Sequence, residues 1–213
     1  MTPSLFHPVY YGSIAQYVAM VSSDTLLFEQ WDNFQKQTYR NRTYVYGANG
    51  LLMLSIPIVH TGKGRQAFRD VKIENNFPWQ QQHWKSLETA YRTSPFFEYY
   101  EEEFVHLYEK KKTFLMDFAL ESMHVIFECL PLNVKISKTE KYLKSYPNDS
   151  VTDFRSLAKC KKEPDWKFSS YIQVFGDKHG FLSNLSVLDL LFNEGTNALM
   201  YLENQVITNK LFV

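Results

Sequence analysis

The chain has 213 residues, of which 45% are hydrophobic and 22% charged, a composition typical of one soluble domain with a substantial core. Its 23 basic and 23 acidic residues give a formal net charge of zero. Nucleic-acid-binding proteins usually carry a marked basic excess, and a membrane span needs about 18 consecutive apolar residues, so neither nucleic acid nor a membrane span is expected.

The first third of the chain predicts one helix and several strands. Apolar residues recur at helical spacing in its first segment, and the later segments are short and rich in β-prone residues. Asn49 and Gly50 favour the positive φ angles of a tight turn, so the strands on either side of them form a hairpin. The predicted elements are a helix over 13–21 and strands over 25–28, 43–46, 51–59 and 68–73.

The middle of the chain, about 79–131, predicts a run of three amphipathic helices. Apolar residues recur at intervals of three and four through this region. Ser94 and Pro95 suit the start of the second helix, as N-cap and first helical residue, and Pro131 ends the third. The predicted helices cover 79–92, 95–112 and 114–130.

The last third begins with an irregular segment, about 138–168. It is rich in Lys, Ser, Asp and Pro and predicts loops with short elements. Farther on, Ser186 and Asp189 have the spacing of a capping box, in which both side chains bond to free backbone N–H groups at a helix start. The predicted elements are strands over 134–136 and 171–175 and helices over 186–194 and 198–202.

Strands at both ends of the chain with helices between them predict an α/β fold. We expect one domain, residues 1–213, in which a mixed sheet is covered by helices, with the three amphipathic helices as its central run. The first helix and strand follow a loop that carries His7, which is the layout of half a nucleotide-binding fold. That likeness concerns the fold alone, because no glycine-rich phosphate loop accompanies it.

Cysteine and histidine usage predicts a reduced, cytoplasmic protein without a metal site. Cys129 and Cys160 are far apart in sequence and form no metal-binding motif. The histidines are dispersed, and no two have the spacing of metal ligands. The start of the chain has no basic segment and no long apolar stretch, so it does not resemble a signal peptide.

A cluster of cations lies between the first predicted strand and the hairpin. If this segment forms a turn, Lys36, Arg40 and Arg42 can converge on a phosphate or carboxylate, with Asn41 orienting it. The alternative is a set of structural ion pairs with nearby acidic residues, which are common in loops. Those acidic residues are Asp24, Glu29 and Asp32.

Three residues are candidates for proton transfer: His7, Glu29 and Asp24. A neutral imidazole at His7 can move protons near pH 7. Asp24 and Glu29 stand at the two ends of the strand over 25–28, and α/β proteins usually place ligand contacts at the carboxyl ends of strands. Glu29 has two alternative roles, as a base or as the partner that holds Arg40 or Arg42 in place.

Several motifs follow one another along the chain: His7-Pro8-x-Tyr10, Asp24 with Glu29, Gln35-Lys36, Tyr39 with Asn41-Arg42, Pro57, Trp79 with His83 and Tyr91, Ser94-Pro95-Phe96-Phe97, and Asn184-Leu-Ser186-x-x-Asp189. Together, in order and spacing, they resemble the WbqC-like family of bacterial proteins over most of the chain. Two departures, after Tyr10 and in the short segment 138–168, indicate a divergent member. The family usually has a further sheet segment in the second of these places.

The resemblance implies a cytoplasmic protein that takes part in the assembly of surface polysaccharides such as O-antigen. It implies the transfer of an acyl, aminoacyl or glycosyl group to or from an activated sugar. The expected partner is an anionic small molecule, either a nucleotide sugar or another donor that bears phosphate or carboxylate. Tyr10 and Tyr39 would stack on a ring of this ligand. Asn184, Ser186 and Asp189 are explained as helix-capping residues, and the resemblance leaves a ligand role open for them.

We therefore expect one cleft that gathers the catalytic and ligand-binding candidates. The catalytic candidates are His7, Glu29 and Asp24, and the ligand-binding candidates are Tyr10, Lys36, Tyr39, Arg40, Asn41, Arg42, Asn184, Ser186 and Asp189. The alternative is a non-catalytic scaffold that docks partner proteins of glycan assembly on the aromatic stretch 96–100. That stretch also fits a helix with one buried face and one face of solvated carboxylates.

Overall fold

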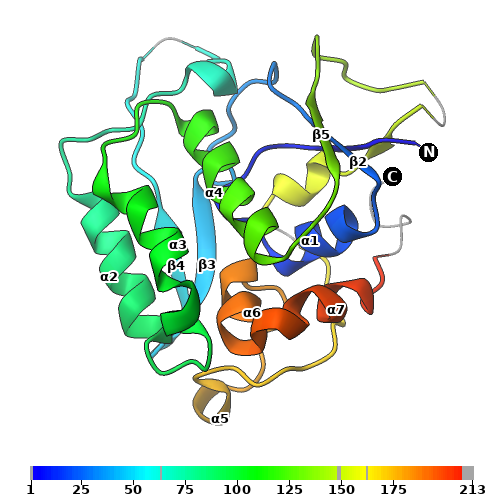
Figure 1. Ribbon diagram of the computed structural model, residues 1–213. Coiled ribbons are helices and arrows are strands. Elements are labelled where there is room, and N and C mark those ends of the chain that lie inside the picture. The colour runs from blue at the N-terminus through cyan, green and yellow to red at the C-terminus, as the bar shows by residue number, and fades with distance from the viewer. Residues whose placement is uncertain (1, 63, 148–149, 162, 208–213) are drawn as a thin grey trace.

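The computed structural model of the protein begins with a strand–helix–strand unit (Figure 1). Strand β1 (Ser4–Phe6) leads through a loop to helix α1 (Ile14–Val21), which returns the chain to strand β2 (Thr25–Phe28). The two strands pair in parallel, with Leu5 opposite Leu27. The structure describes residues 2–62, 64–147, 150–161 and 163–207.

Two later strands complete a parallel sheet around this unit. β5 (Lys135–Lys138) pairs with β2, and β6 (Thr152–Asp153) pairs with β1, so the strand order is β5-β2-β1-β6. Because these strands run the same way, their carboxyl ends lie along one edge of the sheet. The α/β class predicted from the sequence is confirmed, and this edge is where such sheets usually bind ligands.

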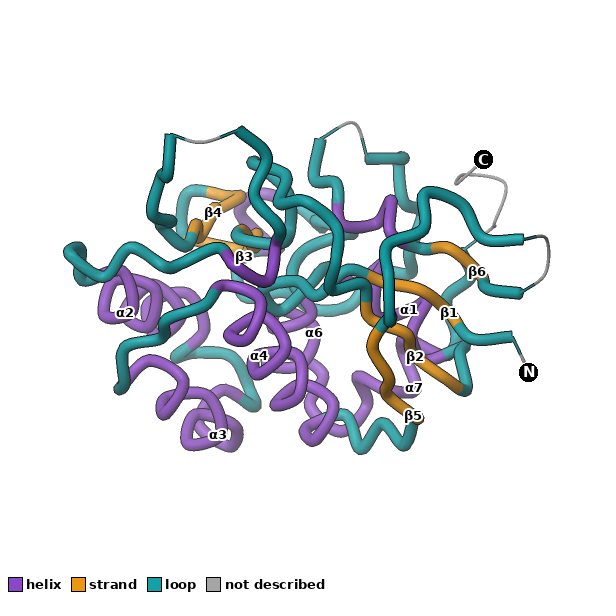
Figure 2. The backbone as a smooth tube through the Cα atoms, turned by 90° about the horizontal axis from the view of Figure 1, so that it is seen from above, coloured by secondary structure: helices purple, strands orange, loops and turns teal. Residues whose placement is uncertain are grey.

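The antiparallel strands form a separate sheet. β3 (Arg42–Gly47) and β4 (Gly50–Ser55) pair along their whole length, and Gly50 has a φ of 98° at the turn. This pairing confirms the predicted hairpin. Glycine suits the turn, because it adopts that φ angle without the penalty that a side chain would impose. Figure 2 shows the hairpin and the parallel sheet on opposite sides of the molecule.

The predicted run of three helices is confirmed in the middle of the chain, as α2 (Trp79–Tyr91), α3 (Phe97–Glu109) and α4 (Leu115–Cys129). Each buries one face, as its apolar spacing predicts. On α3, Phe97 and Tyr100 are buried and belong to the core. These two side chains are therefore not available as the docking face that the scaffold alternative requires.

Short helices form the last third of the described chain: α5 (Gly176–His179), α6 (Val187–Glu194) and α7 (Ala198–Glu203). Helix α6 packs against α3 and β3, and α7 packs against α1, so this part closes the core on the side away from β5. Within the described ranges, no helix has both the length and the apolar composition that crossing a bilayer requires.

Two segments predicted as strands have other structures. Residues 68–73 contain a 3-10 turn, Phe68–Asp70, followed by isolated bridges to neighbouring segments. In 171–175, the side chain of Gln173 bonds to both backbone groups of Leu182. A side chain therefore occupies the place that a strand partner would take.

The loop between β1 and α1, residues 7–13, is buried along its whole length. Buried polar groups need hydrogen-bond partners. The hydroxyl of Tyr108 lies 2.7 Å from that of Tyr10 and 2.8 Å from that of Tyr11, and the Tyr10 hydroxyl also contacts His83 Nδ1 at 3.1 Å. Burial raises the pKa of all three tyrosines, so their hydroxyls stay protonated and able to donate.

Removing the Tyr108 hydroxyl tests this buried loop. We expect Tyr108→Phe to lower the free energy of unfolding by about 1–3 kcal/mol, because the Tyr11 hydroxyl is left buried without that partner. Tyr99→Phe is the matched control, since Tyr99 is 73% exposed on the same helix. Urea titrations followed by circular dichroism measure both variants. Equal unfolding midpoints would show that the hydroxyl cluster does not stabilise the loop.

Candidate functional site

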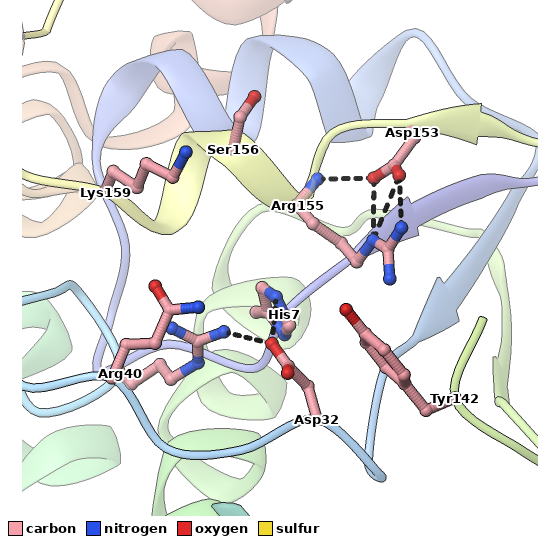
Figure 3. A pocket seen from close by; sticks show the side chains of 9 residues that line it. His7, Asp32, Arg40, Tyr142, Asp153, Arg155, Ser156 and Lys159 are labelled. Atoms are coloured by element: carbon pink, nitrogen blue, oxygen red, sulfur yellow. Dashed lines mark hydrogen bonds and ion pairs between the residues drawn. The ribbon is translucent and has the colours of Figure 1, made fainter. Parts of the chain in front are cut away.

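A cavity of about 240 Å³ lies at the carboxyl ends of the parallel strands. His7 directly follows β1, Asp153 is the last residue of β6, and Asp32 lies in the loop after β2. The parallel topology brings these three side chains to one edge. The lining residues, drawn in Figure 3, are His7, Asp32, Gln35, Arg40, Tyr142, Asp153, Arg155, Ser156 and Lys159.

His7, Asp32 and Arg40 form a polar group at the floor of the cavity. Arg40 Nη2 donates to Asp32 Oδ2 at 2.9 Å, and His7 Nε2 lies 3.3 Å from the same oxygen. Arg40 is 1% exposed and His7 is 5% exposed. Burial, reinforced by the charges of Arg40 and Arg155, lowers the pKa of His7 well below its usual value. The imidazole is therefore neutral at pH 7.

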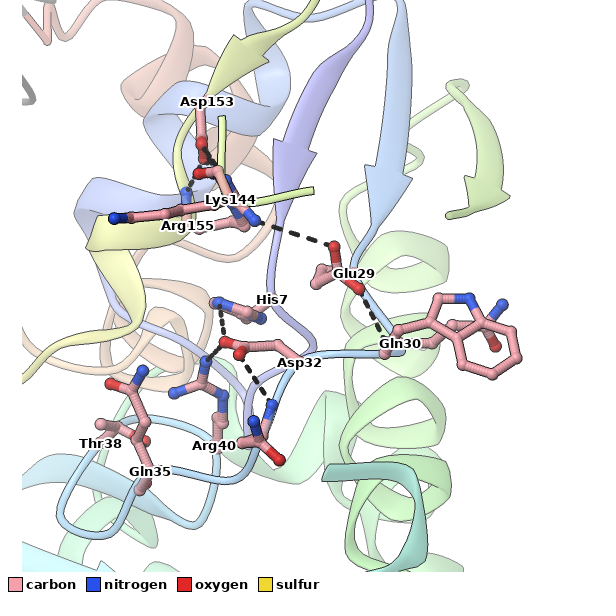
Figure 4. Close-up of polar contacts among 12 residues, drawn as sticks. His7, Glu29, Gln30, Asp32, Gln35, Thr38, Arg40, Lys144, Asp153 and Arg155 are labelled. Carbon is pink, nitrogen blue, oxygen red and sulfur yellow. Dashed lines mark hydrogen bonds and ion pairs between the residues drawn. The ribbon is translucent and has the colours of Figure 1, made fainter. Parts of the chain in front are cut away.

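Arg155 ties together the segments around the cavity. Its guanidinium donates to both carboxylate oxygens of Asp153 and to the backbone carbonyls of Leu143 and Lys144. Its Nη1 also lies 3.8 Å from Glu29 Oε2 (Figure 4). These partners occupy the fork of donors, so Arg155 links the ends of β2 and β6 to the loop that follows β5.

Glu29 holds its neighbours in place and does not line the cavity. Its carboxylate is fully buried, and Oε1 accepts hydrogen bonds from Trp31 N at 2.7 Å and from Thr139 Oγ1 at 3.0 Å. The sequence predicts Glu29 as a base or as the partner of Arg40 or Arg42. Among the described ion pairs, its arginine partner is instead Arg155.

Lys159 belongs to a segment that is paired with the Arg40 loop. An isolated bridge joins Thr38 to Lys159, and Tyr39 N donates to Ala158 O at 2.8 Å. Lys159 is exposed, whereas Arg40 is buried. The ion pairs found among the described residues give Lys159 no carboxylate partner. Its positive charge is therefore available to a ligand.

Tyr142 and Gln35 complete the rim of the cavity. Tyr142 is 46% exposed, and the guanidinium of Arg155 lies 5.6 Å from the centre of its ring. The rim thus offers a phenol, an amide and an ammonium group to a ligand. No group of three His, Cys, Asp or Glu side chains suited to a metal ion occurs in the part of the chain that the structure describes.

The single cleft predicted from the sequence does not form, because three charged candidates lie elsewhere. Asp24 precedes β2 and is about 16 Å from Glu29, at roughly 3.3 Å per strand residue. Lys36 is exposed and lines a separate hollow. Arg42 begins β3, opposite Ser55. Of the three predicted cations, Arg40 alone lines the cavity, and Lys36 and Arg42 do not.

The tyrosines predicted to stack on a ligand are buried in the core. Tyr10 is fully buried in the hydroxyl cluster with Tyr108, and the Tyr39 hydroxyl is hydrogen-bonded to Glu163. Asn41 is buried too, and its Nδ2 donates to Ile56 O at 3.2 Å. None of these three predicted residues lines the cavity, because the side chain of each is hydrogen-bonded to a group inside the fold.

Asn184 and Ser186 join the last helices to the rest of the fold. Asn184 Oδ1 accepts from Ala15 N at 2.8 Å, in the first turn of α1. Ser186 is the N-cap of α6, and its hydroxyl accepts from Leu188 N at 3.4 Å. The predicted capping role of Ser186 is confirmed, and neither residue lines the cavity.

Asp189 is a buried carboxylate that joins three segments. Oδ1 accepts from the Tyr91 hydroxyl at 2.9 Å, and Oδ2 accepts from the Tyr171 hydroxyl at 2.5 Å and from Gln173 Nε2 at 2.8 Å. Ser186 N donates instead to the backbone of β3, so the capping box predicted for Asp189 is wrong. Burial raises the pKa of Asp189 to about 6, although the three hydrogen bonds lower it.

The cavity residues fall almost entirely within a match to a known family. The model of the WbqC-like protein family matches residues 8–164, a span that starts directly after His7 and extends beyond Lys159. The chain belongs to the WbqC-like protein family. A protein of Mycobacterium tuberculosis described as uncharacterized, Rv1507c, is 24% identical over 196 residues, which cover 79% of this chain and 83% of the relative. No solved structure matches the chain.

The sequence prediction missed most of the cavity of this WbqC-like protein. Asp32 was expected as a structural ion-pair partner alone, and Gln35 was seen as part of a motif without a role. The remaining missed residues come from the irregular segment and are Tyr142, Asp153, Arg155, Ser156 and Lys159. This segment, predicted as loops with short elements, contains the two-residue strand β6.

The pH dependence of stability tests the position of Asp189. Its pKa is about 6 in the folded protein against an ordinary 3.8, so its contribution to stability is full below pH 3.8 and is lost as the pH rises through 6. Asp189→Asn removes this contribution. We expect the stability of the wild-type protein to increase by about 2 kcal/mol relative to this variant between pH 7 and pH 4, at about 1.4 kcal/mol per pKa unit.

Urea unfolding at a series of pH values measures this difference. Asp177→Asn is the matched control, because Asp177 is exposed on α5. Wild-type and Asp189→Asn stabilities that change in parallel from pH 7 to pH 4 would contradict the prediction.

Proposed function

We propose that the cavity binds an anionic small molecule and is the site of a group transfer involving it. The observation that carries this proposal is the meeting of a neutral imidazole, His7, and an exposed ammonium group, Lys159, in one cavity at the carboxyl ends of parallel strands. The first can move a proton, and the second can hold a phosphate or carboxylate. We propose an activated sugar that bears such a group, for example a nucleotide sugar. Its phosphate would bind Lys159, and its transfer reaction would release a proton for His7 to accept.

The anion is proposed to bind at the Lys159 side of the cavity. Lys159 has an ammonium group without a carboxylate partner, and Gln35 supplies an amide from the opposite segment. Arg40 is buried behind Asp32, so it contributes a fixed positive field more than a direct contact. A partly enclosed cavity strengthens such interactions, because charges there are less screened than at an open surface.

The proton is proposed to pass to His7. A hydroxyl or amine of the acceptor attacks the donor carbon, the bond from that carbon to the anionic leaving group breaks, and the acceptor proton moves to the imidazole. The resulting imidazolium is stabilised by Asp32, whose carboxylate lies 3.3 Å away. Because His7 Nε2 faces Asp32, the accepting nitrogen is Nδ1, which is buried without a hydrogen-bond partner, so the acceptor must reach the floor of the cavity.

The resemblance to WbqC-like proteins extends the proposal to a biological process. We propose that the transferred group is acyl, aminoacyl or glycosyl and that the product enters bacterial surface-polysaccharide biosynthesis, such as that of O-antigen. A cytoplasmic location agrees with the use of activated sugars. The support for this part is the family resemblance and not the geometry of the cavity.

Calorimetric titration with nucleotide sugars, acyl-CoA and inorganic phosphate tests the proposal. We expect at least one of these anions to bind with a Kd below about 1 mM. Lys159→Met should weaken that binding by roughly tenfold or more, as expected for the loss of a charged hydrogen bond. Lys111→Met is the matched control, because Lys111 is exposed and does not line the cavity.

A second variant separates binding from catalysis. His7→Asn should keep the affinity for the anion within about threefold and abolish turnover of any donor–acceptor pair that the wild-type protein converts. Full turnover by His7→Asn would remove His7 from the mechanism. Failure of every anion in the panel to bind would remove the proposed function itself.

A further inference from the structure

The charges around the cavity are unevenly distributed. On one side, the single guanidinium of Arg155 faces two carboxylates, with Asp153 Oδ2 at 2.6 Å and Glu29 Oε2 at 3.8 Å. At the floor, Asp32 and Arg40 balance one another at 2.9 Å. The remaining cation, Lys159, has no carboxylate partner among the described ion pairs. Counting Glu29, which is buried and does not line the cavity, the Arg155 side has an excess negative charge, and the Lys159 side has an excess positive charge.

The two excess charges lie on opposite sides of the cavity. Figure 3 shows Lys159 on one side and Asp153 on the other, with His7 and Asp32 between them. Asp153 is 38% exposed, so its carboxylate remains open to a ligand even though Arg155 contacts both of its oxygens. The volume of about 240 Å³ is below the roughly 300–1,000 Å³ of pockets for drug-sized ligands, so the cavity suits a sugar phosphate, and the nucleotide of a nucleotide sugar would extend outside it.

We propose that the ligand of this cavity is dipolar and carries an ammonium group as well as an anionic group. The anion lies against Lys159, and the ammonium lies against Asp153, with Glu29 behind it. Amino sugars that bear a phosphate belong to this chemical class. The inference rests on the proposed function, because it assumes that the same cavity is the anion site.

The preference follows from the electrostatics of a small, partly enclosed space. An anion that fills the cavity without a positive group brings a further negative charge towards Asp153 and Glu29. A ligand with an ammonium group at that end replaces this repulsion by an attraction. Two unit charges about 4 Å apart near a protein surface attract or repel one another strongly before desolvation is counted. Even after a large desolvation cost, a difference of tenfold or more in affinity remains.

Three related probes separate the two charges. Glucosamine 6-phosphate carries both groups, glucose 6-phosphate carries the phosphate alone, and glucosamine carries the amine alone. In calorimetric titrations at pH 6.5, where the amine is protonated, we expect glucosamine 6-phosphate to bind at least tenfold more tightly than glucose 6-phosphate. Glucosamine alone should bind more weakly than either phosphate.

Variants of the two sides should change different parts of this preference. Asp153→Asn should reduce the ratio between the two phosphates to about threefold or less, while affinity for glucose 6-phosphate stays the same or increases. Glu29→Gln should also reduce this ratio, because it removes a negative charge that acts on the ligand without contacting it. Lys159→Met should weaken both phosphates by a similar factor. The matched control is Asp177→Asn, which removes an exposed carboxylate that does not line the cavity.

The outcomes distinguish this inference from the proposed function. Equal or tighter binding of glucose 6-phosphate by the wild-type protein overturns the dipolar ligand but leaves an anion site. Failure of both sugar phosphates and of inorganic phosphate to bind contradicts the anion site itself. Because Asp153 also holds Arg155, thermal unfolding is measured for each variant first. If Asp153→Asn does not fold, Glu29→Gln decides, and an unchanged ratio in that variant overturns the inference.

Discussion

The complete burial of the loop between β1 and α1 is the constraint on which the site depends. Loops usually run over the surface, since their backbone groups need hydrogen-bond partners. Here the partners come from distant segments: Tyr10 N donates to Tyr39 O, and Gly12 O accepts from Val187 N. The loop thus packs the segment before the hairpin and the last helices against the parallel sheet. It also fixes His7 at the edge of that sheet, where its ring cannot move without disturbing this packing.

Local patterns were sufficient for the elements that nearby residues decide, namely the middle helices, the hairpin and β2. The cavity was predictable in part, because two of the predicted site residues, His7 and Arg40, line it. Arg155 and Lys159 could not be found this way, because their positions at the cavity depend on the pairing of β6 with β1. A strand of two residues is too short to show an alternating pattern. Lys36 was misplaced because sequence proximity does not fix the direction of a side chain in a turn.

The tyrosines show a second limit of sequence analysis. The chain has 14 of them, and their number favours both a rich core and an aromatic binding surface. Most of the hydroxyls named above bond to buried groups: Tyr10 and Tyr11 to Tyr108, and Tyr91 and Tyr171 to Asp189. Whether a tyrosine faces a partner inside the fold or a ligand outside it depends on the packing of segments far apart in sequence. No local pattern contains that information.

The pairing of β1 with β6 has a consequence for synthesis. Ser4 is opposite Thr152, so β1 must wait for a partner that leaves the ribosome about 150 residues later. At roughly 5–20 residues per second, the delay is about seven to thirty seconds. Contacts of such long range slow folding, and an open strand edge can pair with other chains in the interval. A strand that is interior in the finished sheet is therefore an exposed edge during translation, when chaperones have the longest opportunity to bind it.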